Sequence, residues 1–254
     1  MNATGGFRRR ATYVAEQRSE VEHLLLLDAG DALTAGGSPQ GQMAPEGVLA
    51  GMNLMGYNAM AIGPLELELG ESTLRRGLGE AEFPMLSANA FWSGDRGLVG
   101  EPYTVLQVGP YRLGVIGLTR IPESELADFV VVDPMDVLAE LVHEVAEQVD
   151  AVVLLTNLSY RSAAELAQKV SGIDLVVAAL PRQLPERAVR TPGTSSLVVV
   201  AEQPLPRHSG RRVGKLSVVI DSAGRLKDRG WNSIAMGPEF ADDPEMGDLL
   251  DEYR

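Results

Sequence analysis

Three polar side chains that could take part in chemistry each follow a short apolar run of this sequence. Asp31, Glu66 and Asn157 come after HLLLLD, NAMAIG and AVVLLT, respectively. Short continuous apolar runs are typical of parallel strands that are buried on both faces. Carboxylate and amide oxygens after such strands are ligands that Mg²⁺ or Ca²⁺ accepts, and cations held there can activate water for hydrolysis.

The composition excludes several other functions. The net charge is −13, with 35 acidic against 22 basic residues, and such a field repels the phosphate backbone of nucleic acids. The chain has no cysteine, so it forms no disulfide, thiolate metal site or cysteine nucleophile. Neither a GxGxxG or P-loop motif in a nucleotide-binding context nor a GxSxG motif is found.

The length and hydropathy predict one folded domain over residues 1–254, away from membranes. With 254 residues and 45% hydrophobic side chains, one large core can be buried. No apolar run approaches the roughly 18–20 residues of a membrane span, and no signal-peptide apolar region follows Met1. The chain as given is expected to be cytoplasmic, whereas an upstream signal peptide would make it an exported protein.

Helical and strand-like segments alternate along the whole chain. We expect helices over residues 7–19, 45–55, 132–149, 162–172 and 242–253, and strands over 23–28, 58–63, 84–89, 103–108, 111–118, 151–156, 174–179, 196–203 and 212–224. The pair 103–108 and 111–118 is predicted to form a hairpin that turns at Gly109-Pro110. This alternation predicts a layered α/β fold.

Four segments carry a resemblance to a known family. They are GGFRRRATYVAEQRSEVEHLLLLDAGD (5–31), GMNLMGYNAMAIG (51–63), FPMLSANAF (83–91) and YRLGVIGLTR (111–120). Together they resemble the N-terminal domain of 5'-nucleotidases, in the calcineurin-like metallophosphoesterase superfamily. The resemblance implies an α-β-β-α sandwich of the metallophosphoesterase type, lacking its first strand and without the family's C-terminal substrate-binding domain.

The resemblance also implies a two-metal centre, for which most of the family's ligand motifs are altered here. The Gly-Asp motif is kept, with Asp31 at the position that bridges both metals. The family's Gly-Asn-His-Glu reads Gly63, Pro64, Leu65 and Glu66. Pro64 offers no ligand atom and Leu65 cannot transfer a proton, while Glu66 more often supports the loop than binds metal, and the pair with Glu68 is expected to be solvated.

The remaining ligand motifs are altered further. The Ser-His pair reads Thr156-Asn157, and Asn157 is either a weak neutral ligand or a polar turn residue. The Gly-His-x-His motif falls on residues 179–182, where Leu180 and Arg182 stand at the two histidine positions. The family's Asp-x-His-Gly motif has no counterpart before the first helix. Asp31 and Asn157 are therefore the candidate metal ligands that remain.

The three histidines of the chain are not expected to restore this site. His23 begins a predicted strand at its far end, and His143 lies within an amphipathic helix. His208 precedes RRVGKL in a loop that could approach the site, although a histidine flanked by arginines is usually solvated.

Two opposed functions follow. The first is a catalytically inactive, pseudo-5'-nucleotidase domain retained for binding or assembly, with no catalytic residue and no cofactor, in which Arg182 or another arginine neutralises Asp31. The second is a metal-dependent phosphomonoesterase in which oxygen ligands from Asp28, Asp31, Glu66 and Asn157 weakly hold a divalent metal. A third possibility is a subunit that pairs an open sheet edge with a protein partner or a second copy.

Overall fold

The computed structural model describes residues 6–33, 43–180, 188–200, 212–221 and 226–253. The helices are α1 (Phe7–Glu20), α2 (Pro45–Met55), α3 (Pro64–Leu67), α4 (Glu71–Glu80), α5 (Pro134–Ala146), α6 (Tyr160–Lys169) and α7 (Pro244–Asp251). The strands are β1 (Leu27–Asp28), β2 (Ala59–Ala61), β3 (Met85–Leu86), β4 (Ala90–Trp92), β5 (Tyr103–Val108), β6 (Tyr111–Leu118), β7 (Phe129–Val131), β8 (Ala151–Ser159), β9 (Leu175–Leu180), β10 (Val189–Arg190), β11 (Leu197–Val200), β12 (Arg212–Ile220) and β13 (Leu226–Ala235).

Several helices begin where the sequence places a cap followed by proline. The Asp133 side chain accepts a hydrogen bond from the Met135 amide at the start of α5. The Asp243 side chain accepts one from Met246 at the start of α7. Proline then occupies the first turn of each helix. The N–H groups of this turn have no acceptor inside the helix, so the N–H group that proline lacks costs no hydrogen bond. These local signals explain why the predicted helix starts agree with the structure.

Two sheets form the centre of the molecule. In the first, β1, β2 and β3 lie side by side and are parallel. In the second, the order is β10-β11-β9-β8-β6-β5, with parallel central strands and antiparallel β10 and β5 at its edges. A two-stranded antiparallel ribbon of β12 and β13 and a second ribbon of β4 and β7 accompany them.

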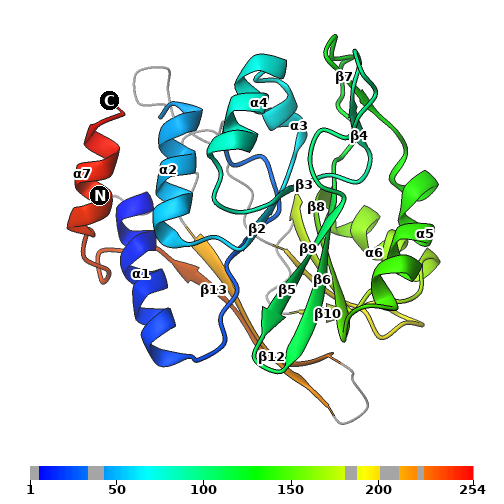
Figure 1. Ribbon diagram of the computed structural model, residues 1–254. Helices are drawn as coiled ribbons and strands as arrows, with labels where there is room; N and C mark the ends of the chain where they lie inside the picture. Colours follow the sequence, from blue (N-terminus) through cyan, green and yellow to red (C-terminus); the bar gives the residue numbers. More distant parts are fainter. Residues whose placement is uncertain (1–5, 34–42, 181–187, 201–211, 222–225, 254) are drawn as a thin grey trace.

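The core has the layers expected of an α-β-β-α sandwich. One apolar cluster joins α1, α2, α4 and α7 to the first sheet, and another joins α5 and α6 to the second. A third cluster lies between the sheets and includes Ala61, Leu86, Val153 and Leu155. The two helix groups lie on opposite sides of the strands in Figure 1. The predicted layered fold is therefore confirmed.

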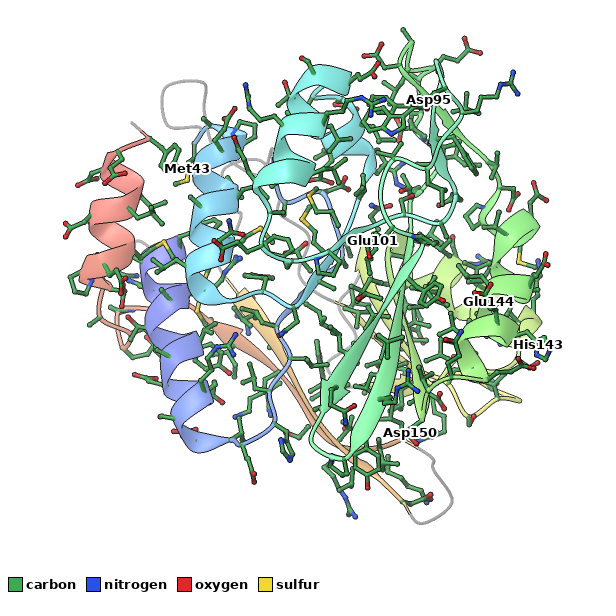
Figure 2. The ribbon with its side chains drawn as sticks, viewed as in Figure 1. Met43, Asp95, Glu101, His143, Glu144 and Asp150 are labelled. Atoms are coloured by element: carbon green, nitrogen blue, oxygen red, sulfur yellow. The ribbon has the colours of Figure 1, made fainter. Side chains whose placement is uncertain are left out.

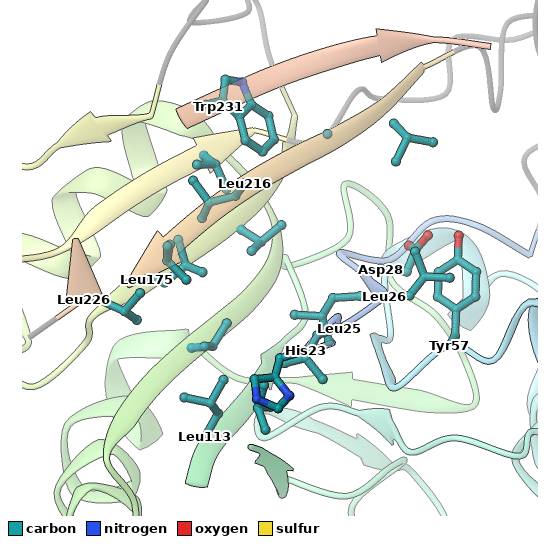
Figure 3. Close-up of a pocket in the computed structure, with 18 of the residues that line it drawn as sticks. His23, Leu25, Leu26, Asp28, Tyr57, Leu113, Leu175, Leu216, Leu226 and Trp231 are labelled. Carbon is teal, nitrogen blue, oxygen red and sulfur yellow. The ribbon is translucent and has the colours of Figure 1, made fainter. Parts of the chain in front are cut away.

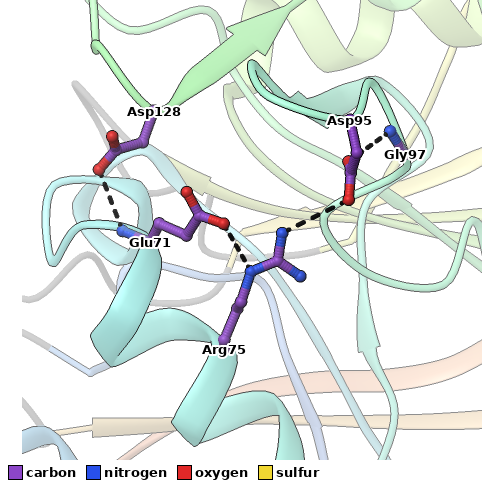
Figure 4. Close-up of polar contacts among 5 residues, drawn as sticks. All are labelled: Glu71, Arg75, Asp95, Gly97 and Asp128. Carbon is purple, nitrogen blue, oxygen red and sulfur yellow. Dashed lines mark hydrogen bonds and ion pairs between the residues drawn. The ribbon is translucent and has the colours of Figure 1, made fainter.

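A small polar cluster connects α4 to the β4–β7 ribbon (Figure 4). The Arg75 Nε atom lies 2.7 Å from Glu71 Oε1, and its Nη2 atom lies 3.6 Å from Asp95 Oδ2. The Arg75 guanidinium also lies over the Trp92 ring, 3.9 Å from its centroid. The Asp128 side chain accepts the Glu71 amide at the N-terminus of α4, where the helix dipole favours a negative charge. These contacts hold the β4–β7 ribbon against the N-terminal half of α4.

The structure corrects several of the predicted boundaries. Only Leu27–Asp28 of the predicted strand 23–28 pairs as a strand. The Leu26 N–H group donates to the Asn58 side chain and not to a main-chain carbonyl of β2. Conversely, β8 continues to Ser159, so the strand contains Asn157. The last residues of the strands predicted over 196–203 and 212–224 lie outside the described residues. The described chain begins one residue before α1, and no strand precedes that helix within it.

None of the described helices is long and apolar enough to cross a bilayer.

Candidate functional site

Polar side chains gather where strands of both sheets end. Ser87 and Thr119 directly follow β3 and β6, and Asn157 lies near the end of β8. Ser87, Thr119 and Asn157 are all completely buried. The carboxyl ends of parallel strands are where open α/β sheets bind ligands. The candidate site is therefore this edge of the sandwich, together with the loops that follow β1 and β2.

Asp31 enters the site in an unusual backbone conformation. Its φ angle is +63°, in the left-handed region that few residues other than glycine adopt, although aspartate tolerates it. Its side chain is buried, with 5% exposure, and Oδ1 accepts the Leu65 amide at 3.0 Å. The loop after β1 is thereby joined to the start of α3.

Glu66 is the central residue of this site. Its Oε2 atom accepts the amides of Asp31 and Gly63, each at 2.8 Å, and its Oε1 atom accepts the Leu33 amide at 2.9 Å. The side chain is completely buried. The expectation that Glu66 is solvated is therefore wrong, whereas Glu68 is exposed as expected. Both carboxylate oxygens of Glu66 are used to hold two loops together, which is the supporting role that the sequence resemblance implied.

Asn157 directs its amide nitrogen toward Asp31. The Asn157 Oδ1 atom accepts the Arg120 amide at 2.7 Å, and its Nδ2 atom is directed at the Ile62 carbonyl at 3.4 Å. A Cβ atom built on Gly63 would collide with both Asp31 Oδ1 and Asn157 Nδ2, so these two atoms lie beside the same backbone position. Because the Arg120 N–H group requires an acceptor, the side-chain orientation is determined by the hydrogen bonds. The Asn157 oxygen is thus occupied by the Arg120 amide, and the amide atom that lies nearer the Asp31 carboxylate is the nitrogen.

Asn157 is also not a turn residue. It lies inside β8 and is completely buried, since its carboxamide satisfies main-chain groups of two neighbouring segments. As a metal ligand Asn157 stays a prediction, and the orientation of its amide weighs against that role.

Arg120 brings a positive charge to Asp31. Its side chain lies close enough for its charge to lower the pKa of Asp31. Its Nε atom is buried and has no hydrogen-bond partner among the described residues. The residue follows Thr119 directly after β6, which is the same polar-after-strand pattern that marked Asp31 and Asn157, so the sequence contained a signal for it.

Burial dominates the ionisation of both acids. Desolvation raises the pKa of Asp31, and the Leu65 amide and the Arg120 charge oppose that rise. Desolvation also raises the pKa of Glu66, to about 8, and the nearby Asp31 charge adds to the rise, while the three backbone N–H groups oppose it. The two carboxyl groups lie close enough to interact, so their protons are lost as a pair and not independently.

A second layer of buried polar groups supports the site. The Thr119 Oγ1 atom donates to the Ile62 carbonyl at 2.7 Å and lies 2.7 Å from Ser87 Oγ. Asn89 donates to the Thr119 and Val132 carbonyls and accepts the Thr119 amide. These groups connect the two sheets at the site, and all of them were missed in the sequence.

The other predicted site positions contribute little. Pro64 is the first residue of α3, and Leu65 supplies only its backbone amide. Leu180 ends β9 at a position paired with Ser159. Arg182 and His208 lie outside the described residues. His143 is 81% exposed and lies on the outer face of α5 (Figure 2).

The described donor set differs from that of a two-metal centre. Two divalent ions about 3.5–4 Å apart need several His or carboxylate ligands. Within the described residues, no three His, Asp or Glu side chains are grouped as they would be to hold a metal ion. The charges that act on Asp31 are those of Arg120, Asp28 and Glu68, and the Glu66 carboxylate nearby is already occupied by backbone amides. The described residues do not fit two bound cations.

Comparison with known proteins gives the relatives of this chain. No family model matches it. Over 125 compared residues, which cover 45% of the chain, it is 38% identical to the snake venom 5'-nucleotidase of Gloydius brevicauda, of which 20% is covered. The structure of a 5'-nucleotidase precursor from Thermus thermophilus matches 99% of the chain with a TM-score of 0.82 and 28% identity. The homologues and structural neighbours are thus 5'-nucleotidases and other members of the calcineurin-like metallophosphoesterase superfamily.

A third match supports the fold. The sulfate thiohydrolase SoxB of Thermus thermophilus matches 98% of the chain with a TM-score of 0.83 and 24% identity. The chain spans about a fifth of the curated venom relative and about half of each of the two solved chains. What is similar is therefore the N-terminal, metallophosphoesterase part of these proteins.

Proposed function

We propose that this chain is a catalytically inactive metallophosphoesterase-like domain that is retained for binding or assembly. The observation that carries the proposal is the surroundings of Asp31. Asn157 Nδ2 lies next to Asp31 Oδ1 at Gly63, and Arg120 supplies a positive charge. A cation that approached this carboxylate would meet the positive charge of Arg120, which opposes the attraction of Asp28, Asp31 and Glu68, and an amide nitrogen that offers no ligand atom.

The charge of Arg120 lowers the pKa of Asp31, which supports the hypothesis that an arginine neutralises this carboxylate. A buried carboxylate without a counter-charge is costly, so its site requires a partner or a proton. The guanidinium of Arg120 supplies positive charge from the chain itself, without a metal. Glu66 supports the same interpretation because its two oxygens hold the Asp31, Leu33 and Gly63 amides and have a structural task.

The experiment combines metal content with hydrolysis on one purified sample. We expect less than stoichiometric Mn, Zn or Mg, and no hydrolysis of p-nitrophenyl phosphate, bis-p-nitrophenyl phosphate or AMP above buffer when each metal is added. Asp31→Asn is the matched variant, since it removes the charge and keeps the size of the side chain.

A positive result would favour the alternative function, a metal-dependent phosphomonoesterase with an atypical and weak site. The decisive outcome would be hydrolysis that requires a divalent metal in the wild-type protein and is lost in Asp31→Asn. Hydrolysis that is equal in the two proteins would instead indicate a contaminating phosphatase.

A further inference from the structure

The ribbon formed by β4 and β7 has a row of apolar side chains on its outer face. Phe91 of β4 pairs directly with Val130 of β7, and on its other side Phe91 pairs with Leu98. Side chains that lie directly opposite one another in antiparallel strands point to the same face. Val130 is 51% exposed, and Phe91 and Leu98 are partly exposed. We call these three side chains the outer row.

The inner face of the same ribbon is attached to the core. Trp92 and Phe129 are buried, and their ring centroids lie 5.2 Å apart. Both side chains belong to the apolar cluster of the first sheet, and the Arg75 guanidinium lies over the Trp92 ring. Because side chains alternate between the two faces of a strand, the outer row points away from this core. The contacts of the inner face hold the outer row in a fixed position.

The outer row is apolar where an exposed ribbon is normally polar. An antiparallel ribbon with one face in water usually alternates apolar side chains that point inward with polar ones that point outward. Phe91, Leu98 and Val130 belong to none of the three apolar clusters of the described residues. The ribbon lies on the side of the molecule away from α1 and α7 (Figure 1). Exposed apolar side chains that are contiguous and bordered by polar residues are typical of interaction surfaces.

The segments that carry the outer row are strongly acidic. Residues 90–101 and 121–133 include one basic side chain, Arg96, and six acidic ones, all of them exposed: Asp95, Glu101, Glu123, Glu125, Asp128 and Asp133. Only Asp95 among these acids forms an ion pair with Arg75, so the surroundings of the row stay negative. Protein interfaces usually have an apolar centre and a polar rim, and opposite charges on the two rims favour association. The occupant should therefore be basic, whereas a second copy of this chain would bring the same carboxylates and be repelled.

We propose that the outer row of the β4–β7 ribbon is the docking surface for a partner polypeptide that carries apolar side chains flanked by lysine or arginine. The apolar side chains of the partner cover Phe91, Leu98 and Val130, and its basic side chains lie against the surrounding carboxylates. The row contains none of the side chains around Asp31. Hydrolysis at the Asp31 site would therefore contradict the inactive-domain proposal and leave this one unchanged.

The test uses a fluorescent, capped peptide with two lysines at each end and a centre of alternating leucine and threonine. A centre of about five residues spans roughly 16 Å when extended, which exceeds the roughly 10 Å across three neighbouring strands. We expect saturable one-to-one binding by fluorescence anisotropy, which weakens as salt is added. Two control peptides, one with glutamate in place of lysine and one with serine in place of leucine, should bind at least about tenfold more weakly, equivalent to about 1.4 kcal/mol.

Two matched variants locate the binding on the protein. Val130→Lys removes an apolar side chain from the outer row and adds a positive charge there. Val219→Lys makes the same change on β12, at a valine that is 42% exposed. Val130→Lys should weaken binding of the lysine–leucine peptide at least about tenfold, while Val219→Lys changes it less than about twofold. Since both valines are exposed, both variants should fold, and the equal change in net charge separates a local effect from a general one.

Several outcomes would overturn the proposal. The first is an absence of binding to the lysine–leucine peptide. Equal binding of the serine peptide would mean that charge alone attracts the probe, and equal effects of the two variants would place the binding elsewhere. A wild-type dimer that Val130→Lys converts to a monomer would assign the outer row to a second copy of this chain instead.

Discussion

Glu66 Oε2 accepts the backbone amide of Asp31 at 2.8 Å, although the two residues are separated by 35 positions in the chain. Through this bond, and through those to Leu33 and Gly63, one carboxylate sets the relative position of the loops after β1 and β2. The geometry around Asp31 therefore depends on a side chain whose role is structural.

Glu66→Gln should lower the free energy of unfolding by about 1–3 kcal/mol, because an amide group has only one acceptor oxygen and would leave a buried backbone N–H group facing its own NH₂. Chemical denaturation measures the change. The control is Glu68→Gln on the exposed neighbour, for which we expect a change within about 0.5 kcal/mol. Equal effects of the two variants would contradict the supporting role of Glu66.

The stability of the protein should fall as the pH rises from about 4.5 to about 8. The pKa of Glu66 is raised from its ordinary value of 4.5 to about 8 in the folded state, mainly by burial. The folded protein consequently holds more protons than the unfolded chain across this window, so the free energy of unfolding decreases with pH. Burial raises the pKa of Asp28 and Asp31 as well, which adds to the same trend.

Denaturation curves across that pH range provide the measurement. Glu66→Gln cannot ionise at this position, so its stability should depend less steeply on pH. A wild-type stability that increases steadily through the window would show that the hydrogen bonds to Glu66 outweigh its burial.

Asp31→Asn should leave stability unchanged or raise it by up to about 1 kcal/mol. Asparagine adopts a φ of +63° readily and can still accept the Leu65 amide. The pKa of Asp31 is raised by burial, so its charge is disfavoured in the folded state and its removal is tolerated. Asp31→Ala is the contrast, because it leaves the Leu65 amide without an acceptor and should cost about 1–3 kcal/mol.

The same variant separates the two functions. If Mn²⁺ or Mg²⁺ raises the melting temperature of the wild-type protein and does not raise that of Asp31→Asn, Asp31 binds metal and the inactive-domain proposal fails. We expect neither melting temperature to respond to metal.

Gly117→Ala should destabilise the protein by at least about 2 kcal/mol. A Cβ atom at Gly117 would collide with the backbone and Cβ of Leu86, where β6 of the second sheet crosses β3 of the first. Gly79→Ala is the matched control, because a Cβ there meets nothing within 4 Å, and alanine favours the helix by about 0.5–1 kcal/mol. Thermal unfolding of the pair gives the answer, and a tolerated Gly117→Ala would mean that the sheets can move apart.

The sequence alone determined the alternating elements and much of their placement. At Asp133-Pro134 and Asp243-Pro244 the capping hydrogen bonds join residues that are only two or three positions apart. The starts of these two helices could therefore be predicted. The buried strands 111–118 and 151–156 could be recognised because a continuous apolar run indicates a buried strand even when the neighbouring strands are unknown. Asp31 could be identified as a candidate from the Gly-Asp motif of the resembled family.

Only the tertiary structure decided what surrounds Asp31. Glu66 is buried because amides from the loop after β1 donate to it. The Asn157 side chain is oriented by the Arg120 amide, which donates to its oxygen, and by the Ile62 carbonyl near its nitrogen. A cavity between β1 and β12 (Figure 3) likewise forms between segments that are far apart in the sequence. The burial of a side chain and the direction of its hydrogen bonds depend on segments that are far apart in the sequence. The local sequence does not tell which of these segments come into contact.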